Sequence, residues 1–593
     1  MKKIMIGLLI FAFTLTIFMA CGGGQASPTT TGTGNRVVTP VANPRPLTVT
    51  PQYGEQADWP QPATSYSTNP LYPQQPAISN TNGFPIVQEP ITMRVTNAVH
   101  PSVLDFVDND LTRFMEELTN VRIEWDNLPL DGAGERLNIM FAAGDRLPDM
   151  VYSASLGSVF QISVGSAGLL IPLQDLIEEH GFHLKKMFEF DPMIVPAMTS
   201  ADGNIYAISD RASQTANQVN MRFWVFQPFL DALGMTIPRT TEELYRYLVA
   251  VRDRDPNGNG RRDEIPLVGS TTGWQMRIDG YLMNAFTFND LRHRFVRDDS
   301  GRISTTVTTP EWRQGLEYMR RLNAEDLLIS ESFTLVQAEV RALVEAPGDA
   351  MVGSLTAGGH QNFTDPNGIR YTQYRVADPL IGPTGRQLTF FDEFALYRTG
   401  RIAISRDCLI PEVVIKWADY NFSADFFTRN RYGVLGRDWV IPPPGTVSVS
   451  GGQAMHEEIL RWGTPQNAHW ANVGTHWDRF ASYDRAVSPD PFELEKVLWD
   501  ARVAYWPHRF MHSVPATLPF TADEARIYND LTNSITNYVN QTMAAWVVGN
   551  QPLNDSTWNA YLQNINNLGL AQLLQVTQSA FDRSWAEVLG YRR

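Results

Sequence analysis

Apolar and polar residues alternate along Ile91–Val99, as they do in a β-strand with one buried face. Helical spacing follows over Val103–Leu118, and residues 121–128 have a second strand pattern. Helical spacing returns in the segment that ends at Gly144, a residue suited to the left-handed position after a helix, and residues 149–154 have a third strand pattern. Alternating strands and helices predict a mostly parallel sheet with helices packed on it.

The end of the third strand is the first place where we expect a ligand. Open α/β sheets bind ligands beyond the carboxyl ends of their strands. Tyr152 and Ser153 lie at that end of the third strand pattern, so both are candidate ligand-binding residues.

The later part of the chain has stronger helix signals. Thr240 can accept a hydrogen bond from the backbone N–H of Glu243, whose carboxylate can return the bond to Thr240 in a capping box. Thr521 and Glu524 repeat this arrangement ahead of a long helical pattern. The chain has 593 residues, 43% of them hydrophobic, which allows a large core and more than one lobe.

The N-terminus carries a targeting signal. Lys2 and Lys3 precede an apolar run over residues 4–20, and Cys21 with three glycines follows. The join at Cys21 resembles a bacterial lipoprotein cleavage site, which implies that residues 1–20 are a signal peptide and that Cys21 is lipid-modified. Phe18 stands where such sites prefer Leu, so an uncleaved membrane anchor is the alternative. Both interpretations place the body of the chain outside the cytoplasm and attach it to the cell membrane.

Residues 21–90 are rich in Pro, Thr and Gly and contain few large apolar side chains. Such a segment cannot bury enough surface to offset its ordering entropy, so we expect a disordered tether. As a flexible coil it would span about 45 Å between the membrane and a folded body over residues 91–593.

Charge and composition narrow the classes of ligand. The net charge of −15 and the pI near 5.2 argue against nucleic acid, whose phosphates need clustered Lys and Arg. Aromatic residues make up 11% of the chain and include fifteen Trp, a composition that is compatible with a flat, weakly charged ligand. Cys408 is the only cysteine besides Cys21, and we expect it to be a buried, inert thiol.

A loop of oxygen-bearing side chains, DRDPNGNGRRDEIP, spans residues 253–266 and predicts a calcium site. One register begins at Asp253 and matches the EF-hand sequence pattern, but it puts Arg261 at a ligand position that an Arg side chain cannot fill. The other register begins at Asp255 and puts Gly260 at the sharp turn. We prefer the second register, in which the donors are Asp255, Asn257, Asn259, the backbone carbonyl of Arg261, Asp263 and Glu264.

The metal is expected to support the fold rather than to act as a sensor. Ile265, Pro266 and Leu267 follow the loop and cannot begin the exiting helix of an EF-hand. The alternative is a polar turn without metal, because Asp, Asn, Pro and Gly are common in any loop.

The segment FLDALGMTIPRTTEELYRYLVAVRDRDPNGNGRRDEIPL, residues 229–267, resembles bacterial extracellular solute-binding proteins of the family 1 type. The nearest relatives resemble the lipoproteins of oligosaccharide ABC importers, including alginate-oligosaccharide-binding proteins. AAGDRLPDMVY, DGNIYAI and PEVVIKWADY agree, so the resemblance covers most of residues 91–593. Relatives often have an acidic residue where Gln227 stands, and the motif GRDW at 436–439 follows a Leu instead of an acidic residue.

The resemblance implies an α/β, two-lobed periplasmic-binding-protein-like fold of the class II type. Each lobe would be a mixed sheet flanked by helices, with extra helices at the C-terminus. It further implies that a monomer captures an oligosaccharide between the lobes and delivers it to ABC permease subunits. In the alginate binders the similar loop holds a structural calcium, which matches the second register.

Aromatic side chains supply the candidate sugar contacts, because sugars present apolar C–H faces on which rings stack. Trp312, Trp417 and Trp558 lie in helical patterns and are predicted to be core. Four others lie in Gly-, Pro- or His-containing stretches that favour loops, where binding residues collect, although each of them could equally serve packing. These candidates are Trp274, Trp439, Trp477 and Trp506.

Two other functions were weighed, a secreted carbohydrate-active hydrolase and a calcium-supported surface adhesin. A glycosidase needs two carboxylates about 5–9.5 Å apart, whereas the adjacent pair Glu178 and Glu179 is better explained as solvated helix surface. The sequence contains no GxSxG, HExxH, Walker A or paired Cys-x-x-Cys motif. We therefore predict a binding protein and not an enzyme.

Overall fold

The computed structural model describes residues 84–87, 89–100, 102–129, 132–212, 215–392, 396–471, 475–477 and 484–591. The expected signal peptide, Cys21 and nearly all of the tether lie outside the described residues, so their boundaries stay predictions. All of the described residues fall in one compact unit of the chain.

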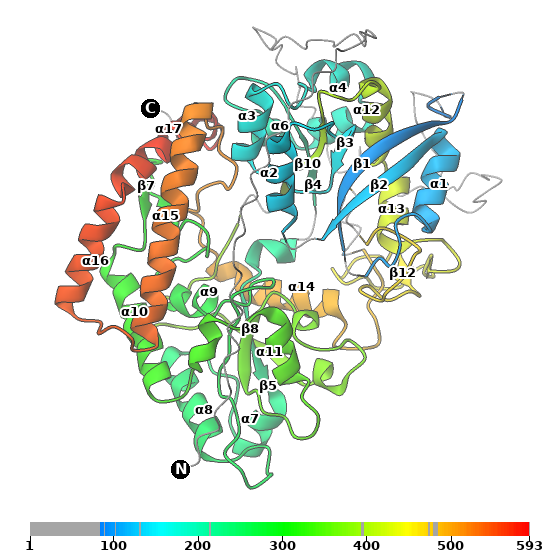
Figure 1. Cartoon of the computed structure of the whole chain (residues 1–593). Coiled ribbons are helices and arrows are strands. Elements are labelled where there is room, and N and C mark those ends of the chain that lie inside the picture. The colour runs from blue at the N-terminus through cyan, green and yellow to red at the C-terminus, as the bar shows by residue number, and fades with distance from the viewer. Residues whose placement is uncertain are drawn as a thin grey trace, which may run out of the picture. The chain divides into compact units, whose positions relative to one another are not determined.

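A five-stranded sheet organises the first lobe (Figure 1). In spatial order its strands are β2 (Val121–Pro129), β1 (Ile91–Val99), β3 (Met150–Tyr152), β10 (Tyr397–Ile404) and β4 (Ile208–Arg211). β1 pairs in parallel with β2 and β3, whereas β10 is antiparallel to both β3 and β4. The strands from the early part of the chain share one direction, as predicted, and β10 makes the sheet mixed because it enters from much later in the sequence.

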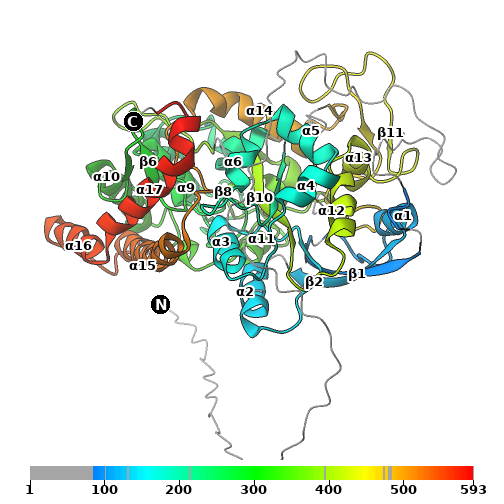
Figure 2. The ribbon, with the colours of Figure 1, turned by 90° about the horizontal axis from the view of Figure 1, so that it is seen from above.

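Helices cover both faces of this sheet. Neighbouring residues of a strand point to opposite sides, and in β1 both sides carry apolar side chains that need to be buried. Val95 packs in one apolar cluster with helices on the first face, and Ala98 packs in another with helices on the second face. On the second face lie α2 (Ala133–Ala143) and α3 (Ser158–Ser166), while α4 and α12 lie side by side on the first (Figures 1 and 2). The helices of the first face are α1 (Asp110–Thr119), α4 (Gln174–His180), α5 (His183–Phe190), α6 (Ile194–Met198), α12 (Pro411–Tyr420) and α13 (Ala424–Tyr432).

A three-stranded antiparallel sheet organises the second lobe. Its order is β8 (Ser354–Ala357), β5 (Arg222–Phe226) and β9 (Tyr374–Ala377). Its core contains Trp224 and Trp312, which are buried. The other elements of this lobe are α7 (Gln227–Leu233), α8 (Thr241–Asp253), α9 (Asp279–Leu282), β6 (Phe295–Arg297), β7 (Ile303–Thr305), α10 (Pro310–Ala324) and α11 (Gln337–Val344).

The chain crosses between the two lobes three times. It leaves β4 for β5 over residues 212–221, which include the 3-10 helix η2 (Thr215–Val219), and it returns from β9 to β10 over residues 378–396. The third crossing runs from α13 through the short strands β11 (Trp439–Val440) and β12 (Glu457–Glu458) to α14 (Leu494–Tyr505), which packs on η2. The crossing segments therefore bring residues from distant parts of the sequence to the edges of both sheets.

Three further helices end the chain, as the resemblance implied. They are α15 (Ala522–Val547), α16 (Asp555–Asn567) and α17 (Leu570–Val588), and α15 packs against α10 of the second lobe and α3 of the first (Figure 1). No helix in the described part of the chain is both long and apolar enough to cross a membrane.

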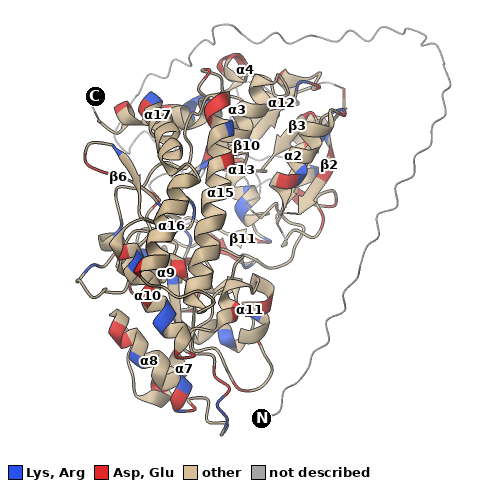
Figure 3. Ribbon diagram, turned by 60° about the vertical axis from the view of Figure 1, so that its left-hand side comes forward, with Lys and Arg blue, Asp and Glu red and all other residues tan. Residues whose placement is uncertain are grey.

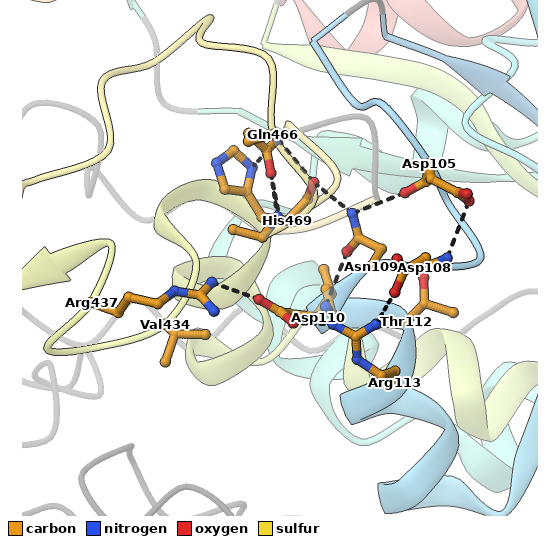
Figure 4. Close-up of polar contacts among 12 residues, drawn as sticks. Asp105, Asp108, Asn109, Asp110, Thr112, Arg113, Val434, Arg437, Gln466 and His469 are labelled. Carbon is orange, nitrogen blue, oxygen red and sulfur yellow. Dashed lines mark hydrogen bonds and ion pairs between the residues drawn. The ribbon is translucent and has the colours of Figure 1, made fainter.

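Helix α1 begins later than its apolar spacing predicted. Residues 103–109 form a polar turn in which Asp105 Oδ1 accepts hydrogen bonds from the N–H groups of Val107 and Asp108 at 2.7 and 3.1 Å. Asn109 then caps the helix by accepting from Leu111 N–H, and Asp110 pairs with Arg437 at 2.6 Å (Figure 4). Because side-chain oxygens satisfy these N–H groups, the predicted start at Val103 is wrong.

Other local predictions fared better. Gly144 adopts φ 73° after α2, and Thr521 and Glu524 form the expected capping box of α15. Thr240 caps α8 through Glu243 N–H at 3.0 Å, but the carboxylate of Glu243 accepts from Arg239 N–H at 2.8 Å instead of from Thr240. The predicted return bond from the Glu243 carboxylate to Thr240 is therefore wrong.

Burial and charge also follow the composition. Trp312, Trp417 and Trp558 are buried, as their helical spacing predicted, and Cys408 is a buried free thiol whose pKa is raised to about 12 by burial. Acidic and basic residues are interspersed along the described ribbon (Figure 3).

Candidate functional site

The carboxyl end of β3 is held in an unusual backbone conformation. Ser153 and Ser155 have φ of 58° and 54°, in the left-handed region that residues with a side chain rarely adopt. Arg401 fixes them: its Nη1 donates to Ser153 O and to Ser155 Oγ at 2.9 Å each, and its Nη2 donates to Ser153 Oγ at 3.1 Å. Such backbone conformations persist where surrounding contacts over-determine them, and they cluster at binding sites.

Paired charges line the same edge of the first sheet. Asp210 at the end of β4 is fully buried and accepts from Arg398 Nε at 2.7 Å and from Arg398 Nη2 at 2.5 Å. Burial and the neighbouring Arg398 together lower the pKa of Arg401 to about 10, and Asp210 acts against this. Next to this group, Arg211 pairs with Asp191 at 2.6 Å. The charges at this edge are thus largely neutralised within the protein.

On the second lobe, Trp274 is held against the end of β8. Gly358 N–H donates to Trp274 O at 2.8 Å, and a Cβ atom on Gly358 would lie 2.3 Å from the Trp274 ring. The guanidinium of Arg222 lies 6.0 Å from the ring centre and donates to the carbonyl of Gly358 and, at 2.6 Å, to that of Ala216. Trp274 is half-buried and is followed by Gln275 with φ 56°. This indole is therefore a fixed, partly accessible ring.

Two tryptophans that sequence reasoning missed join Trp274. Trp462, in the third crossing, and Trp499, on α14, pack with Trp274 against a small apolar cluster, and all three rings are half-buried. We call these three residues the tryptophan cluster. Trp462 lies in the stretch RWGTP and could have been found by the loop criterion that selected Trp274, whereas Trp499 lies in a helical pattern that the criterion excludes. The small apolar cluster consists of Ala216, Val449, Leu494 and Leu498.

Trp506 is half-buried, but cations lie close to its ring. The guanidinium groups of Arg502 and Arg509 are 4.2 and 4.6 Å from the ring centre, and Phe391 meets it edge-on at 5.5 Å. A sugar that stacked on this ring would compete with those contacts.

The other predicted ligand residues lie in the core. Trp439 is 2% exposed and donates from Nε1 to Gly433 O at 3.2 Å, and Trp477 is 3% exposed. Tyr152 is fully buried, its hydroxyl accepts from Thr475 N–H and Asn421 Nδ2, and burial raises its pKa. A ligand can reach these rings only after a rearrangement, so their binding role stays a prediction.

The hydrogen bonds of the loop at 253–266 start from Asp255. Asp255, whose φ is 49°, accepts through Oδ2 from Gly260 N–H at 2.8 Å, which joins positions one and six. Asn257 and Asn259 accept through Oδ1 from the N–H groups two residues on, at 3.0 and 2.8 Å. Asp253 instead ends α8 and pairs with Arg252 at 2.9 Å, so the first register would need this pair to break.

The donor set of this loop suits calcium. Asp255 Oδ1 and Glu264 Oε2 are buried and accept no hydrogen bond from the described residues, and burial together with Asp255 and Asp263 raises the pKa of Glu264. Both Asn side chains reach Asp263 at 3.2 Å, and the Arg261 side chain is exposed, which leaves only its carbonyl as a donor. Within the described residues, no three His, Cys, Asp or Glu side chains are grouped as a metal site, so the amide and carbonyl oxygens would have to complete this one.

Comparison with known proteins finds relatives along most of the chain, although no family model matches it. The chain is similar to the fructooligosaccharide ABC transporter substrate-binding protein FusA of Streptococcus pneumoniae serotype 4 (strain ATCC BAA-334 / TIGR4). The identity is 24% over 514 residues, which are 84% of this chain and 91% of FusA. It is also similar to lipoprotein LipO of Bacillus subtilis (strain 168), at 22% identity over 224 residues, 38% of this chain and 42% of LipO.

Solved structures agree with the fold. FusA in complex with kestose has a TM-score of 0.71 and 23% identity, and covers 84% of this chain and 100% of its own. A FusA EF-hand mutant in complex with fructo-nystose also has a TM-score of 0.71, at 22% identity and the same coverage. Alginate-binding protein AlgQ2 without calcium has a TM-score of 0.64 and 21% identity, and covers 84% of this chain and 99% of its own. The two-lobed α/β fold is thereby confirmed. The similarity to FusA, a substrate-binding protein of an oligosaccharide transporter, agrees with the resemblance seen in the sequence.

Proposed function

We propose that the chain is an extracytoplasmic solute-binding protein that captures an oligosaccharide and hands it to the permease subunits of an ABC importer. FusA, a substrate-binding protein of a fructooligosaccharide transporter, matches 84% of the chain and supports this assignment. FusA and AlgQ2, to which the chain is similar, are binding proteins, so we infer that the sugar is bound without being turned over. We also propose that the chain acts as a monomer.

The tryptophan cluster is the observation that carries the proposal. Trp274, Trp462 and Trp499 come from three distant segments, and their half-buried side chains pack against one small apolar cluster where the chain crosses between the lobes. Rings of this kind bind the apolar faces of sugars, and the partly exposed side chain of Arg398, at the edge of the first sheet, can donate to hydroxyl groups. We infer that the saccharide lies against these residues.

A glycan panel tests the proposal. Purified protein is titrated by calorimetry with fructooligosaccharides, alginate oligosaccharides and other oligosaccharides of matched length, and the mixtures are then analysed by mass spectrometry. We expect one class to bind and to remain intact, and Trp274→Ala to weaken its binding at least tenfold, by loss of an aromatic contact. Trp558→Phe, a change in the core, is the control. Release of cleaved sugar well beyond the amount of protein would contradict the binding function.

We further propose that the loop at 253–266 holds one calcium ion as a support for the fold, away from the sugar. The bond between Asp255 and Gly260, together with the two buried carboxylate oxygens, supports the second register. The ligands would be the side chains of Asp255, Asn257, Asn259, Asp263 and Glu264 with the carbonyl of Arg261. The existence of an EF-hand mutant of FusA supports the assignment of calcium to this loop.

Membrane attachment through Cys21 is also part of the proposal. The basic, apolar and small residues that end at Cys21 support it, as does the similarity to lipoprotein LipO. Cys21→Ser should release the protein from membranes or leave it as an unprocessed precursor, because stable anchoring needs the acyl chains. A variant that fractionates and migrates like the wild type would instead indicate an uncleaved anchor.

A further inference from the structure

Arg431, in the last turn of α13, connects the tryptophan cluster to a buried ion pair. Its side chain is 3% exposed and donates from Nη2 to Glu495 Oε1 at 2.9 Å, and the side chain of Glu495 is 8% exposed. The guanidinium also lies 3.9 Å from the centre of the Trp462 ring. Because Glu495 belongs to the first turn of α14, Arg431 contacts one tryptophan of the cluster and is bonded to the helix that carries Trp499.

A second arginine extends this pair into a network. Arg485 pairs with Glu458 at 2.6 Å and also with Glu493, and all three side chains are nearly buried. Glu493 is the N-cap of α14, where it accepts from the N–H groups of Glu495 and Lys496 at 3.0 and 3.1 Å. Two arginines and three glutamates therefore join α13, β12 and the start of α14.

Stability alone does not account for such a network. Removing charges from water is costly, and packed apolar side chains of similar volume often stabilise a protein equally well or better. A planar guanidinium that bonds a carboxylate at its edge and stacks on a ring with its face leaves few orientations for either partner. The Trp462 ring is half-buried; the rings of His100 and His469 lie 6.1 and 6.3 Å from its centre, and the Arg431 guanidinium, at 3.9 Å, makes a shorter contact than either.

We propose that Arg431 is a positioning residue for ligand binding. Held by Glu495, it fixes the Trp462 ring relative to Trp499 and Trp274, and so it sets the affinity of the tryptophan cluster for a saccharide. That the ligand is a saccharide rests on the proposed function, whereas the fixing of the Trp462 ring by Arg431 does not.

Helix α13 offers a matched control. Arg429 lies two residues before Arg431, its side chain is 5% exposed, and it pairs with buried Asp425 at 3.0 Å. Its guanidinium lies 3.7 Å from the centre of the Phe114 ring, in the core of the first lobe and not in the tryptophan cluster. Arg431→Lys and Arg429→Lys therefore make the same change: each keeps the positive charge beside a carboxylate and removes a planar group from an aromatic ring.

The test compares the two variants in the full chain by thermal denaturation, by titration with the oligosaccharide that the panel identifies, and by acrylamide quenching of tryptophan fluorescence. We expect similar losses of Tm in both variants. Only Arg431→Lys should weaken saccharide binding, by about tenfold, the loss expected when one stacked ring is misplaced. In the Trp462→Phe background, Arg431→Lys should cause little further loss, because the effect acts through that ring.

Fluorescence tests the position of the Trp462 ring separately from saccharide binding. The fluorescence of Trp462 is identified as the emission that is lost in Trp462→Phe. Acrylamide should quench this fluorescence more strongly in Arg431→Lys than in the wild type, and equally in Arg429→Lys and the wild type. If the wild type bound no saccharide, the proposed function would fail while this readout still decided the positioning role. Equal quenching and equal affinity in the two Lys variants would overturn the inference. Should Arg431→Lys fail to fold, Glu495→Gln replaces it with the same expectations. Gln keeps the shape of the Glu495 side chain and removes the negative charge that holds Arg431.

Discussion

At the scale of single residues, Gly358 shows how tightly the candidate site is built. Gly358 has no positive φ, so only space forbids a side chain there, and the space is filled by the Trp274 ring at 2.3 Å from the position of a Cβ atom. We expect Gly358→Ala to push the ring aside, lower the free energy of unfolding by about 1–3 kcal/mol and weaken saccharide binding. Urea unfolding and calorimetric titration measure both effects.

Gly134 is the matched control for this prediction. It lies in α2, where a Cβ atom would meet nothing within 4 Å. Gly134→Ala should therefore leave binding unchanged and raise the free energy of unfolding by about 0.5–1 kcal/mol through helix propensity. Unaltered binding in Gly358→Ala would remove Trp274 from the ligand site.

The proposed calcium loop at 253–266 leads to a second prediction at this scale. Asp255→Asn keeps an oxygen that can accept from Gly260 N–H but removes a carboxylate, so it should abolish the rise in Tm that calcium causes in the wild type. At a calcium concentration 100 times Kd, that rise corresponds to roughly 2.7 kcal/mol. Asp253→Asn should leave it intact, because Asp253 is paired with Arg252 at the end of α8. Calorimetric scans with calcium and with chelator measure the shift, and loss of the shift in Asp253→Asn would favour the first register.

These residues also show what sequence reasoning can reach. The proposed donors of the loop lie within ten residues of one another, so they can be predicted from local chemistry, and Asp255 accepts from Gly260 N–H within the same loop. The tryptophan cluster is different, because Trp274, Trp462 and Trp499 pack against one apolar cluster only after the chain has crossed between lobes. Burial of Trp477 depends on equally distant partners such as Phe190, whereas Trp439 is buried by neighbours such as Tyr432 and Gly433. The loop criterion detects neither kind of burial.

At the scale of elements, Asp419 joins two helices of the first lobe. It lies on α12, is fully buried, and accepts from the N–H groups of His183 and Leu184 at the start of α5, at 3.1 and 2.9 Å. Burial raises the pKa of Asp419 to about 6 in spite of these hydrogen bonds, which act to lower it. The folded protein therefore holds this proton more tightly than the unfolded chain does.

Stability should respond to pH accordingly. The contribution of Asp419 to the free energy of unfolding is fully present below about pH 4 and should fall by about 3 kcal/mol as the pH rises through 6, because the shift is about two pKa units. Other carboxylates titrate in the same range, so the difference between wild type and Asp419→Asn isolates the effect. Urea unfolding of both proteins from pH 4 to 7 measures it. Parallel pH profiles would show that Asp419 titrates normally.

The elements also divide into those that the pattern predicted and those that it did not. β1, β2, β3 and the end of α2 follow from alternation and from Gly144, which are properties of a few neighbouring residues. The start of α1 was missed because Asp105 and Asn109 use side-chain oxygens to cap N–H groups that apolar spacing assigns to the helix. The place of β10 in the first sheet was not predictable, since its partners β3 and β4 lie far earlier in the chain.

At the scale of the whole molecule, the net charge of −15 surrounds a candidate site whose cations are mostly paired. Arg398 is neutralised by Asp210, and Arg431 by Glu495. A protein with this charge repels anions over distances of about 10 Å at moderate salt, and added salt screens the repulsion. We therefore expect neutral oligosaccharides to bind more tightly than uronic-acid oligosaccharides of the same length.

The salt dependence should distinguish the two ligand classes. Affinity for a neutral oligosaccharide should change less than about twofold between low and physiological salt, because screening acts only on charges. Affinity for a uronic-acid oligosaccharide should start lower and rise as salt weakens the repulsion from the acidic surface. Calorimetric titration of a matched pair of ligands at both salt concentrations measures the difference. If the uronic ligand bound more tightly at low salt and lost affinity as salt was added, local cations such as Arg222 beside Trp274 would outweigh the net charge, and the site would be one for acidic sugars.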